Sequence, residues 1–378
     1  MSQEFKQCTK CILDTNDDRE ISFNQNGICS YCNYYDELKQ EVLLKEPERT
    51  KKLKQIVAKI KKDGNGKKYD CIIGVSGGVD STYLAYFVKQ QGLNPLAVHL
   101  DYGWNSELAV KNIENVLNLL GIELYTYVVD WEEIKDLQIA FLKASVVDIE
   151  LINDFAIAAC LYNTAVKFKI KHVIHGWNVV TEGGKLPNGW TWSKYDEMNI
   201  LSIHKKFGTK KLITYPSLSA YKKVYLERIK KLEVFGILNY TDFNKNEIKD
   251  LLVNKLGWKD YGGKHFESVF TRFYQGYILP VKFNIDKRKF HLSVLICSGQ
   301  MTKKEALLEL NSEYYSEELK KNDREFVIKK LGFSDEDFQE IINKPPVSHL
   351  EYASYQTKVY PRITKWLIFL SKIKKIIK

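Results

Sequence analysis

The chain has 378 residues and a formal net charge of +10, and its 44% of apolar residues is enough for hydrophobic cores. No apolar run approaches the roughly 20 residues of a membrane-spanning helix, and the N-terminus MSQEFKQCTKC lacks the apolar core of a signal peptide. We therefore expect a cytoplasmic protein of two or three domains with no membrane span. The positive charge is mostly thinly spread lysine, which favours a solvated surface or anionic small substrates over a nucleic-acid partner.

Four of the seven cysteines lie near the start of the chain in two close pairs, Cys8-x-x-Cys11 and Cys29-x-x-Cys32, separated by 17 residues. Two chelating turns at this distance are typical of a tetrahedral zinc site with four cysteine ligands, and a closed shell of four thiolates indicates a structural metal. An iron–sulfur cluster and four unrelated thiols are the alternatives. Residues 1–62 form the predicted zinc-binding segment with its linking charged helices.

Apolar runs alternate with helical patterns over residues 63–240, the predicted nucleotide-binding domain. The predicted strands cover residues 69–75, 95–100, 123–129 and 171–175, and the helices between them cover 81–91, 106–120, 131–145 and 150–169. This alternation predicts an α/β fold, a doubly wound parallel sheet with helices on both faces. Residues 176–195, rich in Gly and Trp, are predicted to form a functional loop, and residues 220–256 to be helical. Residues 241–378 form the predicted mainly helical, substrate-binding C-terminal region.

The stretch CIIGVSGGVDS passes from a predicted strand through two glycines into a predicted helix. Backbone N–H groups at a helix start attract anions, and Gly77 and Gly78 let a phosphate approach the backbone closely. Ser76 and Ser81 add hydroxyl donors. The carboxylate of Asp80 would repel a phosphate unless a cation lay between them, so it implies Mg²⁺. The Walker and G-x-G-x-x-G patterns are absent, and an ordinary glycine turn is the alternative.

The hexapeptide from Ser76 through Val79 to Ser81 resembles the pyrophosphate loop, or PP-loop, of the ATP pyrophosphatases. That class includes asparagine synthetases, GMP synthetases and tRNA-modifying adenylases. The resemblance implies that ATP is cleaved between its α and β phosphates and that the loop holds the departing pyrophosphate.

Two further strand ends complete the predicted nucleotide site. His99 and Asp101 follow the second strand, at the edge where open α/β sheets bind ligands, and we expect this edge to meet the adenine. A turn cap is the alternative role for Asp101. Gly176 and Glu182 follow the fourth strand, and Glu182 is the best second carboxylate for Mg²⁺, with a solvent-exposed loop Glu as the alternative.

Three segments in order resemble the N-acetyl sugar amidotransferases, from about residue 8 to about residue 310. They are the cysteine-pair segment, the PP-loop followed by VHLDYGWNS, and residues 261–310, whose GGKHFES…DKR…HLS pattern few other families carry. The resemblance implies that the oxygen of a sugar N-acetyl group attacks the α-phosphate of MgATP. Ammonia then displaces AMP to leave an acetamidino group, for surface polysaccharide or flagellar glycans.

No side-chain nucleophile is required by such chemistry, so catalysis consists of positioning and charge neutralisation. The predicted catalytic cations, each otherwise a surface charge, are Lys264, Arg272, Lys287 and Arg288. His265 and His291 are candidates for proton relay, although a structural role is the alternative for each. The tryptophans of the 176–195 loop either stack on sugar or base or pack in the core.

The ammonia is expected from a separate glutaminase, because the chain has no N-terminal cysteine nucleophile and no cysteine in a Gly-rich elbow. The family resemblance implies a partner like the glutaminase of histidine biosynthesis, sometimes with a cyclase-like companion. Free ammonium at high concentration is expected to substitute for it.

The strongest rival is a tRNA thiolase or other tRNA adenylase, several of which combine a zinc ribbon with this loop. Cys71, Cys160 and Cys297, the cysteines outside the two pairs, form no C-x-x-C motif, which counts against thiolation. A non-catalytic nucleotide-binding module is disfavoured because Asp80 and both loop serines are retained. The C-terminal stretch around the apolar run 366–370 is predicted to dock on the body, with a basic membrane-surface helix as the alternative.

Overall fold

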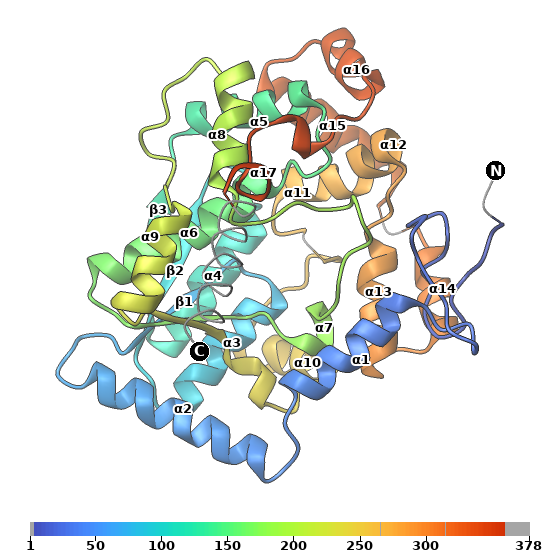
Figure 1. Ribbon diagram of the computed structural model, residues 1–378. Helices are drawn as coiled ribbons and strands as arrows, with labels where there is room; N and C mark the ends of the chain where they lie inside the picture. The colour runs from blue at the N-terminus through green and yellow to red at the C-terminus, as the bar shows by residue number, and fades with distance from the viewer. Residues whose placement is uncertain (1–3, 265, 314, 360–378) are drawn as a thin grey trace, which may run out of the picture.

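The computed structural model describes residues 4–264, 266–313 and 315–359, and it contains a parallel β-sheet with helices packed around it (Figure 1). Over these residues the sheet has five strands in the order β3-β2-β1-β4-β5. The strands are β1 (Cys71–Gly74), β2 (Pro95–Asp101), β3 (Glu123–Val128), β4 (His172–His175) and β5 (Glu233–Gly236). Within the same ranges, no helix combines the length and the apolar character needed to cross a membrane.

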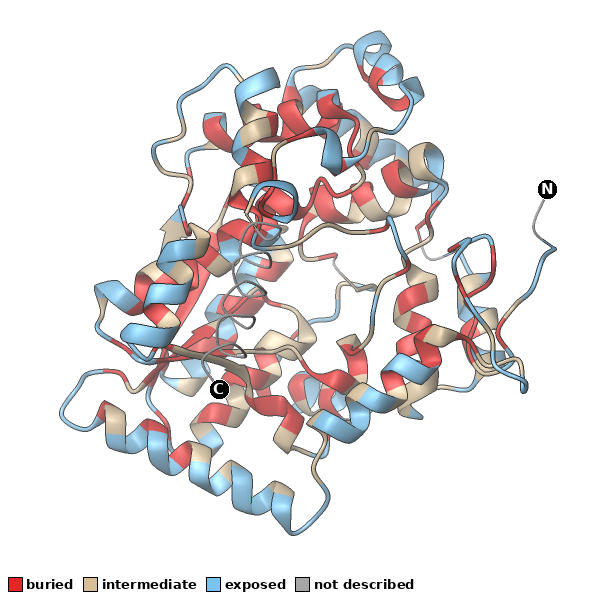
Figure 2. Cartoon of the chain, in the orientation of Figure 1, coloured by how far each residue is buried: buried red, intermediate tan, exposed pale blue. Residues whose placement is uncertain are grey.

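The sheet is doubly wound, as the strand–helix alternation predicts. Two separate hydrophobic clusters cover its two faces, and Figure 2 shows the buried residues gathered along the strands and the inner sides of the helices. One cluster involves α2 (Glu48–Gly64), α3 (Val79–Gln90), α4 (Glu107–Leu120) and α10 (Lys245–Leu256). The other involves α5 (Trp131–Ala144), α6 (Leu151–Lys167), α8 (Glu197–Phe207) and much of the C-terminal region.

The central strands are buried because both faces are covered, whereas the edge strand β3 is largely exposed. In-register pairing sets Gly74 opposite Val98, and Ile73 opposite Ile174. The carboxyl ends of β1, β2 and β4 therefore meet at one edge, where an open α/β sheet binds its ligands.

The prediction that residues 220–256 are entirely helical is wrong in its middle part. A helical stretch of α9 (Ala220–Val224) and η1 (Tyr225–Ile229) is followed by β5, and α10 begins only at Lys245. β5 forms because the exposed side of β4 needs a partner: Val173 pairs with Val234. A four-residue strand stabilised by long-range pairing leaves little periodicity to recognise in the sequence.

The N-terminal segment packs against the C-terminal region. α1 (Ser30–Val42) follows the second cysteine pair and contacts α13 (Arg288–Ser298). The ammonium of Lys289 lies 2.6 Å from Asp14 and 2.5 Å from Asp17, and Lys303 donates to the Cys8 carbonyl at 2.6 Å. The larger hydrophobic cluster includes residues from all three predicted segments, while the predicted boundaries at 62 and 240 stay predictions.

The remaining helical elements form the C-terminal region and the loops around it. They are α7 (Val179–Glu182), η2 (Ile237–Tyr240), α11 (Val269–Phe273), η3 (Tyr274–Ile278), α12 (Leu279–Phe283), α14 (Lys303–Leu310), α15 (Glu317–Leu331), α16 (Asp335–Asn343), η4 (His349–Glu351) and α17 (Tyr355–Lys358). The mainly helical C-terminal region is thus confirmed. The predictions for His265 and for the apolar run 366–370 lie outside the described residues.

Candidate functional site

A cavity of about 770 Å³ opens at the carboxyl edge of the sheet, between the β1–α3 turn, the loop after β4 and the C-terminal region. Its volume lies within the ~300–1,000 Å³ of typical small-molecule sites. Most of the predicted nucleotide and catalytic residues line it: Ser76, Gly78, Val79, Asp80, Ser81, Gly176, Glu182, Lys264, Arg272, Lys287 and Arg288. The fold therefore brings two sequence-distant sets of predicted residues to one site.

The β1–α3 turn is fixed by hydrogen bonds from the segment that follows α10. The Gly77 carbonyl accepts from the Trp258 indole N–H at 2.8 Å and from the Tyr261 hydroxyl at 3.2 Å. Gly77 has φ +84°, and a Cβ there would lie 2.8 Å from the Ala109 carbonyl oxygen. Both the backbone conformation and the lack of space therefore require glycine at this position.

The start of α3 lines the cavity, and no side-chain cap covers its first-turn backbone N–H groups. Its N-cap residue Gly78 provides no side-chain hydrogen bond, so the first-turn N–H groups lack the usual cap. The Ser76 and Ser81 hydroxyls lie 3.2 Å apart, and Ser81 donates to the Gly78 carbonyl at 3.1 Å. These donors and the helix dipole form an arrangement suited to phosphate.

Asp80 and Glu182 form an acidic pair beside this turn. Burial, together with the Glu182 carboxylate, raises the pKa of Asp80 to about 7, while Lys264 and Lys245 act in the opposite direction. The Lys264 ammonium lies 3.2 Å from a Glu182 carboxylate oxygen and 3.4 Å from Nδ1 of His291. A buried carboxylate that ionises reluctantly beside a second carboxylate suits a divalent cation, and Mg²⁺ commonly uses one or two carboxylates plus substrate phosphates.

Gly176 lets the end of β4 approach the first turn of α3. A Cβ at this position would lie 3.1 Å from the Asp80 backbone. The side-chain amide of Asn178, two residues further on, lies 3.4 Å from the Asp80 carboxylate. The segment after β4 therefore helps to position Asp80.

His99 and Asp101 do not line the cavity. His99 donates through Nδ1 to the Val75 carbonyl at 3.0 Å, and its Nε2 lies 3.1 Å from the amide nitrogen of Asn105. Asp101 accepts from the Gly103 N–H at 3.0 Å, which is the turn-capping alternative. Both side chains stabilise the strand end that precedes α4, and the adenine contact stays a prediction.

Two further predicted cations, besides Lys264, are held by carboxylates. Arg272 forms a bidentate pair with Asp323, with both N–O distances at 2.7 Å. Arg288 binds Asp286 through Nε at 3.0 Å and Nη2 at 2.7 Å. These guanidinium groups reach the cavity, but each is already oriented by an acidic partner.

Lys287 differs from its neighbours. Within the described part of the chain, its ammonium makes no hydrogen bond and no ion pair. Burial and the nearby Lys194 lower its pKa, while Asp148, Asp154 and Glu150 oppose the shift. Lys287 therefore lines the cavity with an ammonium that is favoured by nearby acids but held by no direct ion pair among the described residues.

Several cavity residues were not predicted from the sequence, among them Lys245, Trp258, Tyr261 and Glu267. Trp258 and Tyr261 belong to the stretch GWKDYGG, whose last two glycines begin the GGKHFES pattern but whose aromatic residues were given no role. Lys245 is the first residue of α10, and the sequence pattern over residues 220–256 did not show that a helix begins there. Only the tertiary fold places these residues against the PP-loop.

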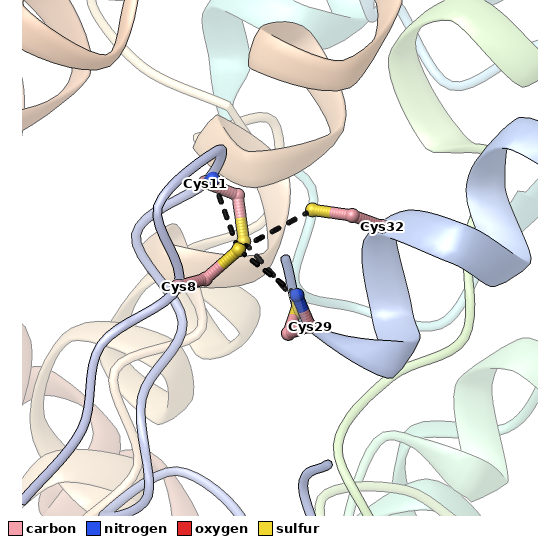
Figure 3. Close-up of side chains that lie close together, drawn as sticks. All are labelled: Cys8, Cys11, Cys29 and Cys32. Atoms are coloured by element: carbon pink, nitrogen blue, oxygen red, sulfur yellow. Dashed lines mark hydrogen bonds between the residues drawn. The ribbon is translucent and has the colours of Figure 1, made fainter. Parts of the chain in front are cut away.

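The two cysteine pairs converge on one point (Figure 3). Sγ of Cys8 lies 3.8 Å from Sγ of Cys32, and Sγ of Cys11 lies 3.7 Å from Sγ of Cys29. All four sulfur atoms lie within 4.8 Å of one another, and all four residues are buried. The Cys11 and Cys29 N–H groups both donate to the Cys8 sulfur, at 3.4 and 3.2 Å. Four thiols in this arrangement fit a tetrahedral zinc ion.

A fifth thiol, which the sequence did not connect with this four-cysteine cluster, lies next to it. Sγ of Cys297, on α13, is 3.5 Å from Sγ of Cys32. The contact is part of the packing of the N-terminal segment on the C-terminal region.

Two family descriptions match separate parts of the chain. "Queuosine biosynthesis protein QueC" matches residues 70–169, and "LPS biosynthesis protein WbpG-like, C-terminal domain" matches residues 267–366. The fold, the PP-loop and the first match define an ATP-dependent enzyme of the PP-loop class. With the WbpG-like match after the PP-loop segment and the four-cysteine cluster before it, the chain has, in the same order, the parts on which its resemblance to the N-acetyl sugar amidotransferases rests.

Curated relatives match only over short stretches. The uncharacterized protein MJ1599 of Methanocaldococcus jannaschii is 32% identical over 118 residues, 30% of this chain and 38% of that protein. The tRNA(Ile)-lysidine synthase of Chlamydia pneumoniae is 37% identical over 76 residues, 19% of this chain and 23% of that enzyme. The chain thus spans well under half the length of either relative.

Solved structures give weaker similarities. The NH3-dependent NAD synthetase of Campylobacter jejuni is 15% identical, with 70% of this chain and 97% of that chain covered, at a TM-score of 0.28. The NMN synthetase of Francisella tularensis is 17% identical, with 62% and 94% covered, at the same TM-score.

The raised pKa of Asp80 predicts a pH-dependent stability. An unfolded Asp titrates near ~3.9, so between about pH 4 and pH 7 the folded chain holds a proton that the unfolded chain releases. The cost of ionising Asp80 therefore appears as the pH rises through this window. Asp80→Asn should raise the melting temperature relative to wild type more at pH 8 than at pH 5, in magnesium-free buffer. The exposed Asp250→Asn is the control, and an equal effect of Asp80→Asn at both pH values would contradict the assignment.

The four-cysteine cluster predicts one tightly bound zinc per chain. Changing Cys32 to Ser should remove most of the zinc and lower the melting temperature by several degrees, because a structural metal contributes folding free energy. Cys297→Ser is the matched control and should keep the full zinc content. Elemental analysis and thermal melts measure both effects, and iron with a visible absorption band would overturn the zinc assignment.

Proposed function

We propose that the protein is an ATP-dependent amidotransferase that converts the acetamido group of an N-acetylated sugar, nucleotide-linked or a nonulosonic acid, into an acetamidino group. One observation supports this most directly. The PP-loop lies in the segment matched by the QueC description, whereas Arg288 and His291 lie in the WbpG-like segment, and all of them line one cavity. ATP and a sugar-linked acceptor would therefore meet there.

The proposed reaction begins with attack of the acetamido oxygen on the α-phosphorus of ATP. The bond from the α-phosphorus to the bridging oxygen breaks, and pyrophosphate departs into the N–H groups and serine hydroxyls at the start of α3. Ammonia then adds to the activated carbon, and AMP leaves to give the amidine. His291 lies on the cavity wall, where an imidazole can accept and return a proton.

Most of the work assigned to the chain is electrostatic. Lys264 lies between Glu182 and His291 and places a positive charge where phosphate charge develops. Asp80 and Glu182 would hold Mg²⁺, which when bound supplies further neutralisation of phosphate charge. The four-cysteine cluster would hold zinc in a structural role, outside the cavity.

The proposal includes a partner. The described thiols are buried or belong to the region of the four-cysteine cluster, so none is placed as an exposed glutaminase nucleophile. A separate glutaminase, in some cases with a cyclase-like companion, would supply ammonia in the cytoplasm. The enzyme itself would take an N-acetylated sugar and no nucleic acid.

A tRNA-modifying adenylase is the second candidate. It is favoured by the match to tRNA(Ile)-lysidine synthase, which stays within about a fifth of this chain. The WbpG-like segment also contributes residues to the cavity, and the similarity to the lysidine synthase does not account for it. The sugar amidotransferase accounts for both the PP-loop segment and the WbpG-like segment and is therefore preferred.

Mass spectrometry of the acceptor tests the proposal. Enzyme, MgATP and ammonium chloride are incubated with UDP-linked N-acetyl sugars, CMP-linked nonulosonic acids or bulk tRNA, and pyrophosphate release is followed in parallel. An N-acetylated sugar should lose an oxygen, gain NH and yield equal amounts of AMP and pyrophosphate. Glutamine without a glutaminase should not replace ammonium. Pyrophosphate release with tRNA and with none of the sugars would establish the rival function.

Asp80→Asn should lower ATP cleavage by roughly 100-fold or more, because a bound cation is worth several kcal/mol of charge stabilisation in the transition state. Asp250→Asn, exposed on α10, should keep wild-type activity. Pyrophosphate release measures both rates, and circular dichroism checks the fold. Near-normal activity in a folded Asp80→Asn protein would exclude the carboxylate from the reaction.

A further inference from the structure

The basic side chains that line the cavity differ in whether a carboxylate holds them. Five of them are ion-paired, and the pairs are Lys249–Asp260, Lys264–Glu182, Arg272–Asp323, Arg288–Asp286 and Lys320–Glu317. Lys245 is different: over the ranges that the structure describes, its ammonium makes no hydrogen bond and no ion pair. It also lies outside the set of residues predicted from the sequence.

The environment of Lys245 disfavours the positive charge of its ammonium group. Burial lowers its pKa, and Lys264 adds to the effect by like-charge repulsion, while Asp80 and Glu309 oppose it. An ammonium removed from water without a partner costs free energy, and a second ammonium nearby increases the cost. An anion between the two lysines would recover much of that cost.

The backbone of Lys245 is fixed by residues on two sides. Its N–H donates to Oε1 of Gln300 at 2.9 Å, and Nε2 of Gln300 donates in turn to the Phe243 carbonyl at 3.3 Å. Asn244 caps the helix, accepting from the Glu247 N–H at 3.3 Å. α10 packs against α3, the helix that begins with the PP-loop. The long side chain therefore starts from an ordered position beside the loop.

Lys287 also lacks an ion pair among the described residues but lies in a different environment. Its surroundings are Lys194 and the acids Asp148, Asp154 and Glu150, whereas Lys245 is influenced by Asp80 and Lys264. Of the two, Lys245 is the one associated with the phosphate-binding turn.

We propose that Lys245 is a further phosphate-binding residue of this site and that it contacts the β and γ phosphates of ATP, which the loop retains as pyrophosphate. The proposal rests on the ATP cleavage of the proposed function. When the bond between the α-phosphorus and the bridging oxygen breaks, that oxygen keeps the electron pair. The departing pyrophosphate gains the negative charge, and the ammonium of Lys245 neutralises part of it without transferring a proton.

Calorimetric binding of magnesium pyrophosphate and of AMP tests this role. Lys245→Ala should weaken pyrophosphate binding roughly 10- to 100-fold, as expected for a lost hydrogen bond between charged groups. AMP, which lacks the β and γ phosphates, should bind as it does to wild type. Lys245→Arg should restore most of the pyrophosphate affinity, and Lys255→Ala, exposed near the end of α10, should match wild type.

The outcomes separate this proposal from the proposed function. Unchanged pyrophosphate affinity in Lys245→Ala, or equal loss of pyrophosphate and AMP binding, would overturn the role of Lys245. Selective loss of pyrophosphate binding supports it even if no sugar is ever amidated, in which case only the acceptor assignment fails. A wild-type protein that binds no pyrophosphate would overturn both.

Discussion

The hydrogen bonds to the Gly77 carbonyl are the constraint on which the site depends. The Trp258 indole and the Tyr261 hydroxyl reach this one oxygen from a segment that follows α10, more than 180 positions along the chain. They fix a turn whose φ of +84° already requires glycine. Without these hydrogen bonds the PP-loop would be a strand–helix turn that is not joined to the segment after α10. With them, the nucleotide domain and the C-terminal region form a single cavity.

The N-terminal cysteine segment stabilises the C-terminal region by packing against α13 and α14. Lys289 and Lys303 join it to α13 and α14, through Asp14, Asp17 and the Cys8 carbonyl. The side chain next to Lys289 in sequence, Arg288, instead reaches the cavity. Because consecutive residues on a helix point in different directions, α13 presents one face to the cysteine segment and another to the site. A metal that orders the cysteine turns would thus help to hold the catalytic wall, although it lies outside it.

The parts of the site that the sequence predicts are those encoded within short stretches. The PP-loop is a contiguous hexapeptide between a strand and a helix, and each cysteine pair is a local chelating turn, so both leave a recognisable pattern. The contacts of Trp258, Tyr261 and Lys245 depend on where α10 and the following loop pack, and no local spacing encodes that. His99 shows the opposite case: it stands at the correct sheet edge, but it turns inward to the Val75 carbonyl.

The cations that line the cavity fall into two groups, those held by an acid and those without an ion pair among the described residues. Paired cations such as Arg272 and Arg288 are held by acids that already balance them, so they shape the walls at little electrostatic cost. Lys245 and Lys287 are balanced by no such partner among the described residues, and each lies in the field of a different set of acids. Lys245 is influenced by Asp80 and Glu309 and by two further lysines, whereas Lys287 is influenced by three acids and one lysine. The ammonium that lacks nearby compensation therefore lies beside the PP-loop, where the phosphates of ATP would bind, whereas Lys287 lies among three acids that favour its charged form.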